Sequence, residues 1–143
     1  MSIILWCKNN ESTNYNAFFF ATSYVKLQDA YAAESNKLGT WTDIGYTAPG
    51  TKQSGGSFKS TVFEYSGDMT ATTDLTAEGA APTGDEWKAA ALTALNDCAS
   101  GSTWTINVTG KTNGVTYVNA YSDATNCKPL TPSFENIGTK AAE

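Results

Sequence analysis

The stretch 103–121, TWTINVTGKTNGVTYVNAY, decides the fold that the sequence predicts. Large apolar side chains occupy every second position of its first part, namely Trp104, Ile106 and Val108. Such alternation is typical of a β-strand with one buried face. The run 115–121 follows Asn113-Gly114, a pair that favours tight hairpin turns. The sequence therefore predicts an antiparallel hairpin here.

Further strands are expected upstream because aromatic and β-branched residues concentrate there. The predicted segments are 3–8, 15–25, 40–46, 57–65 and, more weakly, 69–75. The run Phe18-Phe19-Phe20 directs rings to both faces of its strand, which predicts a strand that is covered on both sides. These segments favour a sheet built mostly from antiparallel strands.

One helix is predicted at about 83–99. Thr83 and Glu86 fit a capping box, in which each side chain bonds the backbone N–H of the other residue. The apolar residues that follow share one helical face, namely Trp87, Ala91, Leu95 and Cys98. The predicted fold is mainly β: one antiparallel β-sandwich domain, 1–143, with this amphipathic helix packed on it. An irregular C-terminal strap is expected from about 125, anchored by Phe134 and Ile137.

The sequence contains no histidine and no arginine, and its nine lysines face fourteen acidic residues, for a net charge of −5. Without histidine there is no Ser-His-Asp or Cys-His pair. Scattered lysines form no basic stripe for nucleic acid, and no glycine-rich phosphate loop occurs. A glycosidase needs two facing carboxylates in a cleft, and the spacing of Asp43, Glu64 and Asp68 in the sequence does not indicate such a pair. We therefore expect a protein that is not an enzyme and uses no cofactor or metal.

Charged residues make up only 16% of the chain, whereas about 25% is usual in soluble domains. Aromatic rings among amides and hydroxyls suit either a glycan-binding face or a self-association surface with little charge to desolvate. The candidate residues for either surface are Tyr15, Asn16, Trp41, Asp43 and Tyr46. Both alternatives remain open on the sequence alone.

Three cysteines are present, Cys7, Cys98 and Cys127. They are either buried thiols, or one internal bridge with a leftover thiol. Cys127 lies in the irregular tail, where a partner chain has access, so we expect it to form an intermolecular disulfide in the assembled protein. Cys7 and Cys98 are expected to be buried and inert.

Part of the N-terminal half resembles a known group of proteins. The segments are Ile3-Ile4-Leu5-Trp6, Lys8-Asn9-Asn10-Glu11-Ser12, Asn16-Ala17-Phe18-Phe19-Phe20 and Gly55-Gly56-Ser57-Phe58. They are similar to a group of small bacterial and fungal β-sandwich proteins that includes the crystal-forming octin. In composition the chain also resembles the aegerolysins, small acidic β-sandwiches that bind membrane lipids.

The resemblance to the first group implies a structural protein that self-associates into an ordered intracellular assembly or crystal, in the cytoplasm or a vacuole. The alternative function is a glycan- or lipid-binding module of lectin or aegerolysin-like toxin type. The apolar run 3–7 is too short for a signal-peptide core or a transmembrane segment, so we expect neither. Secretion remains an alternative if a leader has been removed.

Overall fold

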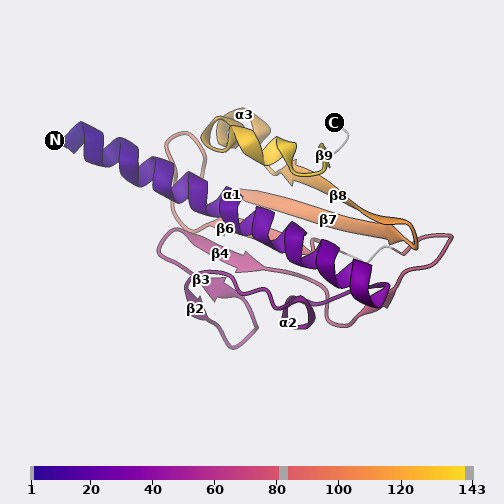
Figure 1. Ribbon diagram of the computed structural model, residues 1–143. Helices are drawn as coiled ribbons and strands as arrows, with labels where there is room; N and C mark the ends of the chain where they lie inside the picture. Colours follow the sequence, from indigo (N-terminus) through magenta and orange to yellow (C-terminus); the bar gives the residue numbers. More distant parts are fainter. Residues whose placement is uncertain (1, 81–83, 141–143) are drawn as a thin grey trace.

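The computed structural model describes the backbone of residues 2–80 and 84–140, and the side chains of residues 17–80 and 84–139. It begins with α1 (Ser2–Ser35), a 34-residue helix that lies across the sheet (Figure 1). The strands predicted at 3–8 and 15–25 are therefore wrong, because both segments belong to α1. Two features of the sequence favour the helix. Its buried residues recur at helical spacing, and no glycine or proline precedes Gly39.

The remaining elements are mostly short. In chain order they are β1 (Lys37–Leu38), α2 (Trp41–Ile44), β2 (Thr51–Lys52), β3 (Phe58–Lys59), β4 (Phe63–Ser66), β5 (Thr73–Asp74), β6 (Trp87–Ala91), β7 (Thr103–Lys111), β8 (Gly114–Tyr121), α3 (Ala124–Cys127), the 3-10 turns η1 (Lys128–Leu130) and η2 (Pro132–Asn136), and β9 (Thr139–Lys140). The predicted mainly β fold is confirmed. The predicted strand 57–65 overlaps two short strands, β3 and β4, and the predicted strand 69–75 contains only β5.

The strands form two sheets in the part of the chain that the structure describes. One contains β1 and β5, and the other has the order β2-β3-β4-β6-β7-β8-β9. All neighbours pair antiparallel except β8 and β9, which are parallel. The predicted hairpin is confirmed as β7 and β8. Lys111 pairs with Gly114, so Thr112 and Asn113 form the tip and Gly114 already belongs to the second strand.

The large sheet has one covered face and one open face. Directly paired residues share a face, and the covered face carries the buried side chains Phe63, Tyr65, Trp87, Ala89, Ala91, Trp104, Ile106, Val108, Tyr117 and Asn119. Helix α1 reaches this face, where Phe20 contacts Tyr65, and so does the C-terminal segment, where Phe134 contacts Trp87. The second large sheet that a sandwich requires is not confirmed, because a helix and a strap take its place (Figure 1).

The predicted helix at 83–99 is wrong. Thr83 lies outside the described residues, and Trp87–Ala91 is the strand β6 between β4 and β7. Trp87, Ala89 and Ala91 are buried while Lys88 and Ala90 are half-buried, which is a period of two. The alanine-rich sequence favours a helix locally, but pairing on both sides in the sheet overrides that weak preference. Residues 92–101 form turns rather than a helix.

The C-terminal segment from 124 consists of short helical turns and the edge strand β9. Phe134 and Ile137 are buried, as expected of its anchors. Asn119 of β8 ties this segment down through its side-chain amide, which donates to the backbone oxygens of Glu135 at 3.1 Å and Ile137 at 2.5 Å. Trp104 Nε1 donates to Thr131 Oγ1 at 2.7 Å. These bonds hold the strap on the covered face.

Candidate functional site

The inner side of α1 is fixed to the protein by a stripe of buried residues. These are Ala17, Ala21, Tyr24, Gln28 and Ala32. Gln28 Nε2 donates to the Gly39 carbonyl, and the Gly39 N–H donates to Gln28 Oε1, each at 2.9 Å. The small alanines allow close approach to the sheet, and the amide pair satisfies the polar groups that this approach buries.

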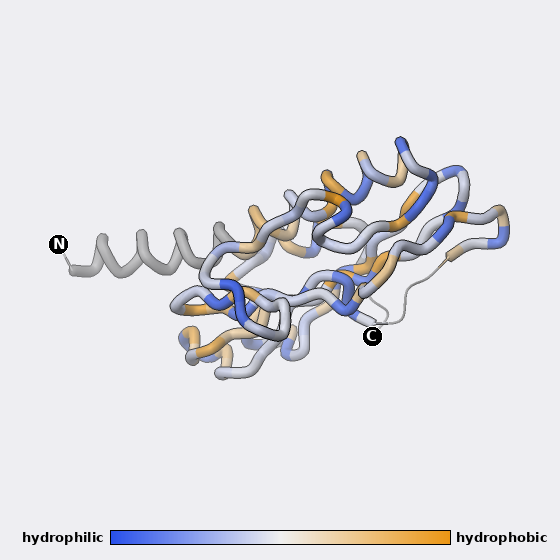
Figure 2. The backbone as a smooth tube through the Cα atoms, turned by 90° about the horizontal axis from the view of Figure 1, so that it is seen from below, coloured by the Kyte–Doolittle hydropathy of each residue, from blue (hydrophilic) through white to orange (hydrophobic). Residues whose placement is uncertain are grey.

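The outer side of α1 carries an aromatic residue that the protein itself leaves half uncovered. Phe19 is 48% exposed, and its ring meets Phe20 edge-on with 5.4 Å between centroids. Phe18 and Phe20 are half-buried and pack against the core. Figure 2 shows that hydrophobic positions recur along the coloured part of α1. We call Phe18, Phe19 and Phe20 the aromatic run, and it is the candidate association surface.

Of the surface residues predicted from sequence, Asp43 has a structural role. The segment 40–46, predicted as a strand, instead forms α2 and its caps. Asp43 Oδ2 accepts from the Thr40 N–H at 3.0 Å and hydroxyl at 2.7 Å, while the Asp43 N–H donates to Thr40 Oγ1 at 3.2 Å. This reciprocal capping box, closed by Gly45 at a φ of 75°, explains why the segment turns.

Trp41 and Tyr46 come together, with ring centroids 4.7 Å apart, but both are committed to internal bonds. Trp41 Nε1 donates to the Glu86 carbonyl at 3.0 Å, and the buried Tyr46 hydroxyl accepts from Trp87 Nε1 at 2.9 Å. Trp41 also stacks on Phe58. Its ring therefore packs within the protein. The side chains of Tyr15 and Asn16, the other two predicted surface residues, lie outside the described ones.

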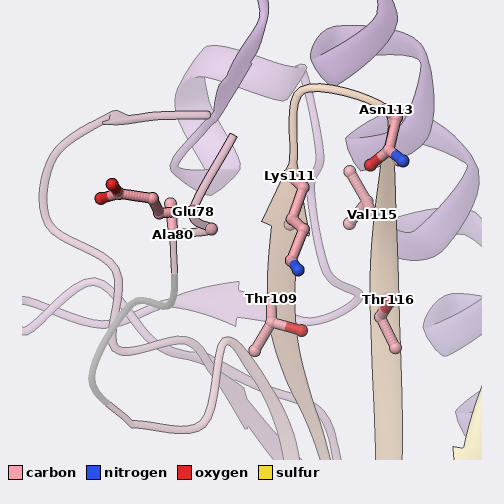
Figure 3. A pocket seen from close by; sticks show the side chains of 10 residues that line it. Glu78, Ala80, Thr109, Lys111, Asn113, Val115 and Thr116 are labelled. Carbon is pink, nitrogen blue, oxygen red and sulfur yellow. The ribbon is translucent and has the colours of Figure 1, made fainter. Parts of the chain in front are cut away.

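Two hollows lie on the surface of the described residues. One, of about 540 Å³, lies at the end of the β7–β8 hairpin, with Glu78, Lys111 and Asn113 around it (Figure 3). The other, of about 380 Å³, lies beside Trp41 and is lined by glycine and hydroxyl residues and by Asp68. Neither lining contains a nucleophile paired with a base, so neither has the arrangement of an acyl-transfer site.

Glu86 is the most unusual ionisable group of the described chain, although its sequence context predicts only a helix cap. Its side chain is 1% exposed, and neither carboxylate oxygen has a hydrogen-bond partner. Burial, and then the negative charge of Asp68, raise the pKa of Glu86 to about 7. No motif reveals such a site in advance, because the burial depends on strands that are distant in the sequence.

The cysteine prediction is wrong for Cys127. Cys127 is bonded to Cys98 within the same chain, and both are fully buried. The bond joins the loop after β6 to α3, and Cys127 is buried within the protein rather than exposed at its surface. Of the alternatives left open by the sequence, the internal bridge is the one observed. The side chain of Cys7 lies outside the described residues.

Within the described residues, no cluster of three or more histidine, cysteine or acidic side chains is arranged to hold a metal ion. Over the same residues, no helix combines the length and apolar character needed to cross a membrane. No protein-family model, curated protein or solved structure matches the chain.

Proposed function

We propose that this protein is a structural, non-enzymatic subunit that associates with further copies of itself into an ordered assembly, using the outer side of α1 as one contact surface. Phe19 is the observation that carries the proposal. A ring that is 48% exposed at the centre of an aromatic run is costly to leave in water, and covering it favours association.

The length of α1 supports a second copy as the occupant of this surface. Its 34 residues extend over about 50 Å, at a rise of 1.5 Å per residue. The nine residues of β7, the longest strand described, extend over about 30 Å. The helix therefore runs past the sheet that covers its inner side (Figure 1). A second copy brings a helix of the same length, and two such helices can pack side by side.

The open face of the large sheet offers a second surface that suits close packing. It carries small or uncharged half-buried residues, among them Ala90, Thr103, Thr105, Asn107, Val118 and Ala120, and its charged residues include Glu64 and Lys88, which pair with Ala90 and Thr105. Contacts on the uncharged part of this face, over β7 and β8, desolvate few charges. An assembly built on both surfaces explains why a chain of this size carries so little charge.

The disulfide bears on where assembly takes place. Disulfides persist in oxidising compartments and are rare in the cytosol. The buried Cys98–Cys127 bond therefore favours assembly outside the cytosol over the cytoplasmic location expected from the sequence. The glycan- or lipid-binding alternative has no specific support, since Trp41, Asp43 and Tyr46 are engaged in internal contacts.

Sedimentation velocity and electron microscopy of the purified protein test the proposal. We expect the natural protein to form large regular particles as its concentration rises, and Phe19→Ser to need at least tenfold more protein for the same degree of association. Leu92→Ser is the matched control, because Leu92, 39% exposed, is the other large exposed hydrophobic residue described. It should assemble like the natural protein. Thermal unfolding verifies that both variants are folded.

Two results would contradict the proposal. One is a natural protein that stays monomeric at all concentrations, and the other is equal loss of assembly in both variants. A monomer that binds a glycan array or liposomes would instead support the binding-module alternative.

A further inference from the structure

Glu86 is a buried acid without a compensating partner. Both of its carboxylate oxygens lack a hydrogen bond, and none of the ion pairs among the described residues includes it. Leaving a charged carboxylate in such a place is expensive, whereas a neutral carboxylic acid is tolerated far better. The position therefore favours a bound proton in the folded protein.

Among the described residues, the charged groups that act on Glu86 are negative. Asp68, from the loop after β4, and the adjacent Asp85 both repel a charged Glu86. Tyr24 of α1 is neutral, since burial holds the pKa of its hydroxyl well above the usual range. The backbone N–H of Met69 favours the charged form without reaching hydrogen-bond geometry with either carboxylate oxygen, and its effect is smaller than those of burial and Asp68.

Glu86 also lies where helices and sheet meet. Its backbone N–H donates to Ile106 of β7 at 3.1 Å, and its carbonyl accepts from the Trp41 indole of α2 at 3.0 Å. Gly67 passes so close to this carbonyl and to Trp41 that a side chain at that position would collide with both. An ionised Glu86 carboxylate would draw water into this region. The packing between α1, α2 and β6 would then become looser.

We propose that Glu86 is a proton-operated switch, which fastens α1 and α2 to the sheet when it is protonated and loosens them when it is ionised. The direction follows from linkage. The carboxyl pKa rises from 4.5 to about 7 on folding, so folding takes up a proton between these values. Stability is greatest at low pH and falls as the pH rises toward 7, and above 7 it stays at its lower level.

Urea unfolding between pH 5 and pH 8 tests the switch in the natural protein, Glu86→Gln and the control Glu78→Gln. A shift of this size predicts that the unfolding constant of the natural protein rises roughly a hundredfold over this range. Glu86→Gln carries a neutral amide of the same shape, so it should vary less than threefold and be the more stable at pH 8. Glu78 is exposed, and its variant should follow the natural protein.

Equal pH dependence in the natural protein and Glu86→Gln would overturn the proposal. A second measurement covers the case in which Glu86→Gln does not fold. The carboxyl carbon of Glu86, followed by NMR in the natural protein, should titrate near pH 7, and a midpoint near 4.5 would equally overturn the switch. Hydrogen exchange of the backbone amides of α1 should also be faster at pH 8 than at pH 6, by more than the intrinsic rise of the exchange rate between these two pH values.

Discussion

Tyr117 and Asp29 are 88 residues apart in the chain, yet the Tyr117 hydroxyl donates a hydrogen bond of 2.7 Å to Asp29 Oδ1. The same hydroxyl lies 3.2 Å from the backbone oxygen of Val25. Tyr117 belongs to β8 and both acceptors to α1, so one side chain joins the helix to the sheet. Burial and the Asp29 carboxylate hold the pKa of Tyr117 well above its usual range, so the hydroxyl stays a donor at all working pH values.

Tyr117→Phe is predicted to lower the free energy of unfolding by about 1–2 kcal/mol, because it removes a bond to a charged acceptor without leaving a cavity. Asp29 is exposed and regains water, which keeps the loss modest. Urea unfolding monitored by circular dichroism measures it. Tyr31→Phe is the control, since no hydrogen bond of the Tyr31 hydroxyl is found among the described residues. Equal losses in the two variants would show that the Tyr117 hydroxyl adds no stability.

Gln28 also attaches α1 to the rest of the protein, through two hydrogen bonds with the backbone of Gly39. It is fully buried, and its amide satisfies both the N–H and the carbonyl of Gly39. Gln28→Leu fills the space but leaves two buried backbone groups unsatisfied, so we predict a loss of about 2–5 kcal/mol in unfolding free energy. Hydrogen exchange of the backbone amides around Gly39 should also become faster in this variant.

Gln53→Leu serves as the comparison for Gln28→Leu, because the side chain of Gln53 bonds only to the nearby Thr51 carbonyl, at an exposed site. Its change should stay within about 0.5 kcal/mol. If Gln28→Leu lowered the unfolding free energy as little as Gln53→Leu, the hydrogen bonds between Gln28 and Gly39 would not stabilise the fold.

The parts of the fold that were predictable are those in which local pattern and tertiary environment agree. In β7, Trp104, Ile106 and Val108 are buried in strict alternation, as their spacing predicts. The mainly β composition and the anchors Phe134 and Ile137 follow in the same way. Here each residue's own preference and its neighbours point to one structure.

The first helix was not predictable from residue preferences, since phenylalanine, tyrosine and threonine favour strands. The overlooked signal was the absence of glycine and proline before Gly39, together with the helical spacing of Ala17, Ala21 and Tyr24. The opposite error occurred at 87–91, where alanines that favour a helix are held in the central strand β6. Only the long-range pairing with β4 and β7 decides that segment.

The candidate site was the least predictable part. Trp41, Asp43 and Tyr46 do lie together, but their polar groups are bonded inside the protein. The run Phe18-Phe19-Phe20 was expected in a strand covered on both sides, which is wrong, because the run lies in the helix α1 and Phe19 is exposed there. The surroundings of Glu86 include segments that are distant in the sequence, such as the region of Tyr24, about sixty residues away. Sequence spacing carries no information of that kind.

The disulfide gives the last prediction. Cys98 and Cys127 are separated by 29 residues, and a closed loop of that length restricts the unfolded chain by about 3–4 kcal/mol in the chain-entropy treatment. Replacing both cysteines by serine should lower the unfolding free energy by about this amount and release the strap from α3 onward. Added reductant should destabilise the natural protein similarly and leave the double variant unchanged, which separates loss of the bond from the effect of the serines. Non-reducing gels test whether the disulfide stays within one chain. The assembled protein should run as a monomer, because Cys127 is already paired with Cys98 of its own chain. Dimers that disappear with reductant and persist in the double variant would assign the intermolecular link to Cys7. Dimers that disappear in the double variant would show instead that Cys98 and Cys127 exchange partners during assembly.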